Sequence, residues 1–63
     1  MDVSHVLTEE QRAAGLRVRQ DGELRILTRD NCQLDVFGQG VSDSAIRLCA
    51  HWWAMRRGAN RDN

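Results

Sequence analysis

Residues 16–37 read LRVRQDGELRILTRDNCQLDVF, and the fold class follows from this segment. Its apolar residues recur at every second position in three short runs, which is the pattern of half-buried β-strands. We therefore predict strands at about 16–20, 23–29 and 32–37. The alternating apolar positions are Leu16, Val18, Leu24, Ile26, Cys32, Leu34 and Val36.

Two turns connect these strands, and the hydrophobic pattern indicates their length. A two-residue loop at Asp21-Gly22 would place apolar and charged residues on the same face of the sheet. We therefore predict three-residue loops, Gln20-Asp21-Gly22 and Arg29-Asp30-Asn31, in which the third residue adopts the left-handed conformation. In this register all the aliphatic residues except Leu27 share one face. The predicted pairs are Val18 with Leu24, Leu16 with Ile26, Ile26 with Leu34 and Leu24 with Val36.

A short helix is predicted before the strands. Thr8 and Gln11 have the spacing of a capping box, in which each side chain binds the backbone N–H of the other residue. The helix then spans about 9–14, and Gly15 is placed to end it because glycine adopts the left-handed conformation easily. Residues 1–6 are expected to be flexible.

A longer helix is predicted after the strands, over about 43–57. Ser42 caps this helix, and Gly58 is placed to end it. Residues 59–63 are expected to be flexible. The chain is thus predicted to be a single αβββα domain, residues 1–63, of the α+β class. A three-stranded antiparallel β-meander packs against one C-terminal helix in this fold.

Composition limits the classes of function. The chain has 63 residues, of which 41% are hydrophobic, and this suits one small folded domain. Nine basic residues balance nine acidic ones, so the net charge does not require nucleic acid as a partner. No run of 18 apolar residues occurs, and no charged segment is followed by an apolar one. We therefore expect no membrane helix and no signal peptide, and we expect a cytoplasmic protein.

Two neighbouring apolar stripes follow the second predicted helix. The first stripe, which can cover the sheet, consists of Ile46, Cys49, Ala50 and Trp53. The second stripe consists of Leu48, Trp52 and Met55. It needs a cover, which is either the N-terminal segment with Val3, Val6 and Leu7 or another molecule, and both alternatives stay open. Trp52 is the residue that we expect to anchor a partner.

The predicted outer face of the sheet carries arginines. Arg25 would lie opposite Asp35 and Arg19 opposite Glu23, as in an ordinary surface of cross-strand ion pairs. The same face can instead contact an acidic protein. Together with the second stripe, its predicted partner-binding residues are Arg17, Arg19, Arg25, Leu27 and Phe37. The alternative function is nucleic-acid binding, for which the candidates are Arg17, Arg19, Arg25, Arg47, Arg56 and Arg57.

Residues that could carry catalysis or bind a metal are sparse. The sequence contains no Tyr and no Lys, and no HExxH motif, phosphate loop or nucleophile elbow. Cys32 and Cys49 are both predicted to point inward, and whether they form a disulfide stays open. Cys49 and His51 cannot share one face of a helix, so we predict no metal site. We expect a protein that is not an enzyme and has no cofactor and no small-molecule substrate.

The order of elements resembles that of the double-stranded RNA-binding domain. The segment Gly38-x-Gly40-x-Ser42, followed by small residues, is similar to the start of that family's last helix. Asp43 and Ser44 stand where the family has paired lysines, so the resemblance implies the fold rather than RNA binding. Three strands and a helix also resemble the DNA-binding domains of phage integrases, whose sheet arginines would correspond to Arg17, Arg19 and Arg25.

Three short segments are similar to small accessory proteins of phages and mobile elements. They are Leu7-Thr8-Glu9-Glu10-Gln11, Gly15-Leu16-x-Val18 and Ser42-x-x-x-Ile46-Arg47. This resemblance implies a non-catalytic inhibitor of a host complex, a class that includes anti-CRISPR proteins. We therefore predict a small protein-binding module whose partner is a protein complex or a second copy of the chain, with nucleic acid as the alternative.

Overall fold

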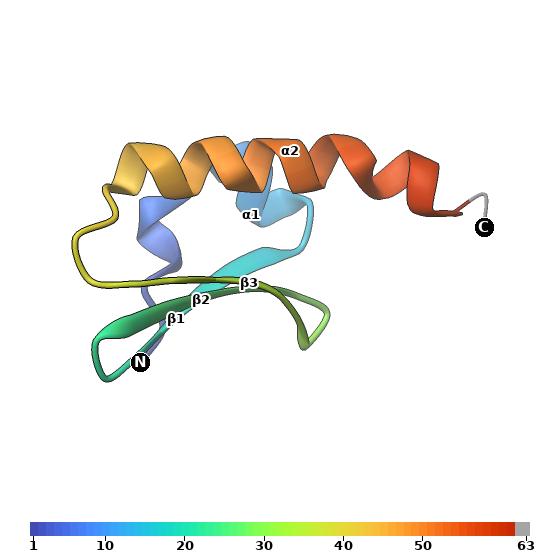
Figure 1. The fold of residues 1–63 in the computed structure, drawn as a ribbon. Helices are drawn as coiled ribbons and strands as arrows, with labels where there is room; N and C mark the ends of the chain where they lie inside the picture. The colour runs from blue at the N-terminus through green and yellow to red at the C-terminus, as the bar shows by residue number, and fades with distance from the viewer. Residues whose placement is uncertain (62–63) are drawn as a thin grey trace.

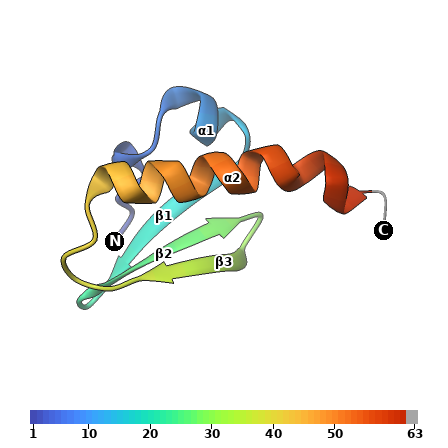
Figure 2. The ribbon, with the colours of Figure 1, turned by 45° about the horizontal axis from the view of Figure 1, so that its top comes forward.

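The computed structural model describes the backbone of residues 1–61 and the side chains of residues 1–56. Three strands form one antiparallel sheet in the order β1-β2-β3. The long helix α2 lies across one face of this sheet, and the short helix α1 lies beside it (Figures 1 and 2). The predicted α+β fold is confirmed. The elements are η1 (a 3₁₀ turn, Ser4–Val6), α1 (Glu9–Ala13), β1 (Leu16–Asp21), β2 (Leu24–Arg29), β3 (Cys32–Phe37) and α2 (Asp43–Arg61).

Both helices begin at the predicted caps. The Gln11 backbone N–H donates to Thr8 Oγ1 at 3.1 Å, and the Thr8 backbone N–H donates to Gln11 Oε1 at 3.1 Å. This reciprocal pair is the predicted capping box. At the start of α2 the backbone N–H of Ala45 donates to Ser42 Oγ at 3.1 Å. Local side-chain bonds therefore place the beginning of each helix.

The end of α2 differs from the prediction. The helix continues past Gly58 to Arg61, so the prediction that Gly58 ends it is wrong. One glycine costs a helix only about 1 kcal/mol relative to alanine, so it does not by itself stop a long helix. Of the predicted flexible tail, residues 59–61 belong to α2, and residues 62–63 lie outside the described residues.

The first residues form a short ribbon along the edge of β1. The backbone N–H of Val3 donates to the Val18 carbonyl at 2.9 Å, and the N–H of Gln20 donates to the Met1 carbonyl at 2.7 Å. Residues 1–6, for which flexibility is predicted, are thus hydrogen-bonded to β1 and include η1. An unpaired strand edge offers backbone groups that need partners, and the N-terminus supplies them here.

The turns between the strands are shorter than predicted. They contain two residues each, Gly22-Glu23 and Asp30-Asn31, so the predicted three-residue loops are wrong. Gly22 has a φ of 62°, and Asp30 and Asn31 have φ values of 53° and 66°. Two-residue turns with positive φ match the right-handed twist of the strands that they join. Gly, Asp and Asn are the residues that accept this conformation at the lowest cost.

The shorter turns decide which face of the sheet each side chain of β2 occupies. Val18 pairs with Leu27 instead of Leu24, and this shift by three positions exchanges the two faces of β2. Leu27 is therefore a core residue with 0% exposure, whereas Leu24 faces the opposite side and is 45% exposed. The predicted pairs between the first two strands are wrong for this reason, and so is the prediction that Leu27 faces outward. The predicted pairs between the second and third strands are wrong by two positions, since Ile26 pairs with Val36 and not with Leu34.

The side chains of β3 exchange faces as well. Asp35 pairs with Leu27, and Phe37 pairs with Arg25, so these side chains face α2. The register shifts beside Leu27, and Leu34 on the irregular strand still packs against the core.

The core lies between the sheet, α2 and the N-terminal segment. Its buried residues are Val6, Leu7, Leu16, Val18, Leu27, Ile46 and Ala50. Cys49 and Trp53 of the first predicted stripe pack around this cluster and are half-buried. Val6 and Leu7 are thus used in the core beneath α2.

Candidate protein-binding surface

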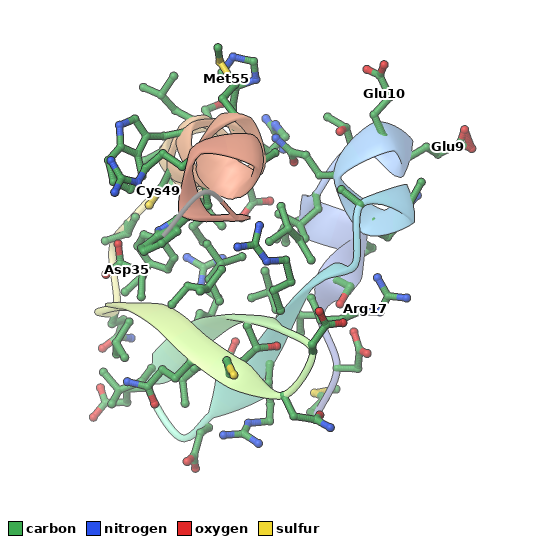
Figure 3. All side chains as sticks on the ribbon, turned by 90° about the vertical axis from the view of Figure 1, so that its right-hand side faces the viewer. Glu9, Glu10, Arg17, Asp35, Cys49 and Met55 are labelled. Atoms are coloured by element: carbon green, nitrogen blue, oxygen red, sulfur yellow. The ribbon has the colours of Figure 1, made fainter. Side chains whose placement is uncertain are left out.

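The second apolar stripe of α2 is exposed. Leu48 is 72% exposed, Trp52 51% and Met55 71%. Their spacing of four and three residues places them on one line along the helix. This line lies on the side of α2 away from the sheet, where Met55 is seen in Figure 3. We call these three residues the docking stripe.

Trp52 is held between two neighbours on the surface of α2. Its ring meets the Trp53 ring edge to face, with 5.0 Å between the centroids and an interplanar angle of 86°. The Arg56 guanidinium carbon lies 4.5 Å from the centroid of the Trp52 ring, which is a cation–π contact. Both contacts restrict the side chain before any partner binds. A restricted aromatic residue loses little conformational entropy on binding, which favours its use as an anchor.

A depression of ≈ 340 Å³ adjoins the docking stripe between α1 and α2. Its lining residues are Thr8, Glu10, Gln11, His51, Ala54 and Met55. The Gln11 side-chain amide donates to the Arg47 carbonyl at 2.9 Å and so holds α1 against α2. Glu10 is exposed on this flank of the stripe.

Arg25 does not lie on the outer face of the sheet. Its Nη1 is 2.9 Å from Asp43 Oδ1, and its guanidinium also donates to the carbonyl of Val41. The prediction that Arg25 lies opposite Asp35 on the outer face is wrong, because the observed register turns β2 over. Arg25 instead ties the first turn of α2 to the sheet.

Two further candidate arginines donate to backbone carbonyls of the chain itself. The Arg17 guanidinium donates to the carbonyl of Arg12 at 2.9 Å and to that of Leu16 at 2.7 Å. The Arg47 guanidinium donates to the carbonyl of Val6 at 3.1 Å. These bonds join α1 to β1 and α2 to η1, so both side chains have a structural role.

The other candidate arginines lie on different sides of the molecule. Arg19 is exposed on the outer face of the sheet, where its partner is Ile26 and not the predicted Glu23. Arg56 is exposed on α2, against Trp52. The side chain of Arg57 lies outside the described part of the chain. Arg17 and Arg19 line one depression beside β1, whereas Arg25, Arg47 and Arg56 lie elsewhere, so the candidates whose side chains are described are not gathered on one surface.

The outer face of the sheet carries apolar residues that the sequence prediction had assigned to the core. Leu24 is 45% exposed and Val36 is 39% exposed there. The residue that the prediction had placed outward with Leu27, Phe37, is half-buried and faces α2. In β2 apolar residues occupy both even-numbered and odd-numbered positions. Its alternation pattern therefore does not indicate which face of the strand points toward α2.

The two cysteines lie in different surroundings and are both free. Cys32 is exposed at the end of the hairpin, so the prediction that it points inward is wrong. The Cys49 thiol donates to Asp35 Oδ2 at 3.2 Å. Desolvation of the thiol, and then the adjacent Asp35 carboxylate, raise the pKa of Cys49 to about 11. At neutral pH this side chain is therefore a protonated thiol and a poor nucleophile.

Metal ligands, buried polar groups without partners and membrane-spanning helices are not found in the described part of the chain. No group of three His, Cys, Asp or Glu side chains within the described residues could hold a metal ion. Every buried side-chain nitrogen or oxygen in that part of the chain has a hydrogen-bond partner. None of its helices is at once long enough and apolar enough to cross a bilayer.

Comparison with known proteins gave no match to any family model, to any curated protein or to any solved structure.

Proposed function

We propose that this chain is a small non-catalytic protein-binding module that docks through the docking stripe. The observation that carries this proposal is the exposure of three large apolar side chains, 51–72% each, on one line of a regular helix. Isolated apolar residues on a surface need no explanation, but a contiguous patch is typical of an interaction site.

The size of the patch supports the proposal. A large side chain has a surface of about 150–250 Å². Multiplied by the exposed fractions of the three residues, this gives a total exposed apolar area of roughly 400 Å². At about 25 cal/mol per Å², covering this area would contribute up to about 10 kcal/mol before the costs of association. Trp52 lies at the centre of the stripe, where the residues that dominate binding energy usually lie.

No observation of similar weight supports nucleic-acid binding or the inhibition of a host complex. Arg25 and Arg47 are bonded within the chain, and Arg19 and Arg56 lie on different elements. Phosphate binding needs several cations along one groove, which this distribution does not supply. Both alternatives stay predictions.

The first test asks whether the docking stripe belongs to the core. The double substitution Leu48→Ser and Met55→Ser should change the free energy of unfolding by no more than about 0.5 kcal/mol, because both side chains are largely exposed. Urea denaturation followed by circular dichroism measures this change. A loss of more than about 1.5 kcal/mol would mean that the stripe is packed in the monomer, and the proposal would fail.

The second test asks whether the stripe is covered in the cell. A photo-crosslinking amino acid replaces Met55 in the full chain, which is expressed in its native host, and the same amino acid at Arg19 is the control. We expect covalent adducts from position 55 that disappear when Trp52→Ala is added. Equal adduct yields from positions 55 and 19, or no adduct at all, would overturn the proposed function.

A further inference from the structure

We infer that the docking stripe binds a second copy of this chain, with the two α2 helices packed in parallel about a two-fold axis. This inference rests on the proposed function, because it names the partner of the same surface. It follows from three observations. They are the spacing of the docking stripe together with Ala45, which we call the seam, the charges on the two flanks of the seam, and the protection of the sheet edges.

The spacing is that of a helix-pairing seam. Ala45 is exposed and continues the docking stripe, so that Ala45, Leu48, Trp52 and Met55 are separated by three, four and three residues. This is the a/d repeat of two helices that pack side by side, and it is narrower than a stripe that faces a sheet. The opposite side of α2, with Ile46 and Ala50, is already buried in the domain core.

The two flanks of the seam carry opposite charges. On one flank Glu10 of α1 lines the depression that also includes His51 and Met55. On the other flank lies Arg56, which is two turns beyond Cys49 and so on the same side of α2. In the view along α2 in Figure 3, Glu10 and Cys49 lie on opposite sides of Met55. By their exposed charges the Glu10 side is the acidic flank and the Arg56 side is the basic flank, where the half-buried Asp35 carboxylate accepts a hydrogen bond from the Cys49 thiol.

This arrangement selects the direction of pairing. A two-fold axis parallel to the helices brings the acidic flank of each copy against the basic flank of the other, so that Glu10 meets Arg56 of the second copy twice. An axis across the helices, which makes them antiparallel, brings Glu10 against Glu10 and Arg56 against Arg56. Opposite charges across an apolar seam set partner choice and orientation, and like charges oppose pairing.

The edges of the sheet are protected against strand-to-strand self-association. The edge of β1 is covered by the N-terminal ribbon, whose Val3 bonds to Val18. The edge strand β3 carries a register irregularity and the inward-facing charge of Asp35. Both are devices by which proteins prevent strand-to-strand pairing.

The apolar area that the docking stripe can bury limits the affinity of the dimer. A standard interface buries about 800 Å² on each partner, whereas the docking stripe supplies roughly half of this. The remainder must come from Glu10, His51 and Arg56 beside it. We therefore expect a weak dimer with a dissociation constant of roughly tens to hundreds of micromolar.

Sedimentation velocity of the full chain, from about 10 µM to about 1 mM, tests the inference. Wild type should pass from monomer to dimer across this range, and Trp52→Ala should weaken association at least tenfold. Leu48→Ser is a second variant that removes a seam residue and keeps the two tryptophans. Circular dichroism of each variant confirms that it is folded.

Charge reversal tests the direction of the helices. Glu10→Arg and Arg56→Glu should each weaken association roughly tenfold, and the double variant should restore it. Glu9→Arg is the matched control, because it changes the same turn of α1 by the same charge at a residue that does not line the depression. It should leave association unchanged.

Two results would overturn the inference. One is a wild-type chain that stays monomeric at about 1 mM. The other is a folded double variant that associates as weakly as the single variants. In either case photo-crosslinking from position 55 separates the two proposals. Adducts to a different protein keep the proposed function and reject the dimer, whereas the absence of adducts rejects both.

Discussion

The variant Leu27→Ala tests the strand register on which the core depends. Leu27 is 0% exposed and packs with Leu16, Val18 and Ile46 in the buried cluster. Removing a fully buried leucine side chain costs the transfer free energy of its lost methyl groups and leaves a cavity, which together amount to about 3 kcal/mol. We expect the free energy of unfolding to fall by this amount.

Leu24→Ala is the matched control on the same strand. Leu24 is 45% exposed and faces away from α2, so its truncation should cost less than about 1 kcal/mol. The register expected from the hydrophobic pattern predicts the reverse order, because it places Leu24 inside and Leu27 outside. The difference between the two variants therefore separates the two registers.

Urea denaturation followed by circular dichroism and tryptophan fluorescence measures both changes. A domain of this size is stabilised by about 3–9 kcal/mol, so Leu27→Ala can approach the limit of folding. Leu27→Val, with an expected loss of about 1 kcal/mol, keeps the comparison measurable in that case. A larger loss for Leu24→Ala than for Leu27→Ala would refute the register.

Three further predictions concern single contacts. Arg25→Ala should cost about 1 kcal/mol, and a double-mutant cycle with Asp43→Ala should give a coupling of about 0.5–1 kcal/mol; a coupling of zero would contradict the ion pair. Thr8→Ala should cost about 1 kcal/mol in the same urea assay, since it removes one half of the capping box; unchanged stability would mean that the cap contributes nothing. The raised pKa of Cys49 means that folding favours the neutral thiol. Its contribution is therefore complete below pH 9 and is lost as the pH rises toward about 11. The loss should be less than about 2 kcal/mol, because the thiol is partly screened by solvent, and it should disappear in Cys49→Ala. The same decline with pH in Cys49→Ala would assign the effect to another group.

Local structure could be predicted from the sequence because it depends on neighbours along the chain. The capping box of Thr8 and Gln11 and the cap at Ser42 each need residues only three positions apart. The strands follow from alternation over a few residues, and the order of elements gives the fold class. The residues of the docking stripe could also be predicted, since helical spacing alone puts them on one line.

The exposure of the docking stripe depended on the tertiary structure. Val6 and Leu7 had two possible uses, to cover the stripe or to enter the core, and the sequence holds no preference between them. In the structure η1 places them in the core, because residues 1–3 bind the edge of β1 and so direct the chain beneath α2. The stripe is left uncovered as a consequence.

Interactions between near neighbours along the chain suffice to specify the helices, the three strands and their connection into one small domain. The packing of the whole chain selects which side of β2 faces α2. The hydrophobic pattern of β2 is ambiguous, because Leu24 and Ile26 point to one face and Leu27 points to the other. The geometry of the turns therefore sets the register. Two-residue turns at Gly22 and Asn31 suit the twist of the paired strands, and they bring Leu27 beneath α2 while they turn Leu24 toward solvent.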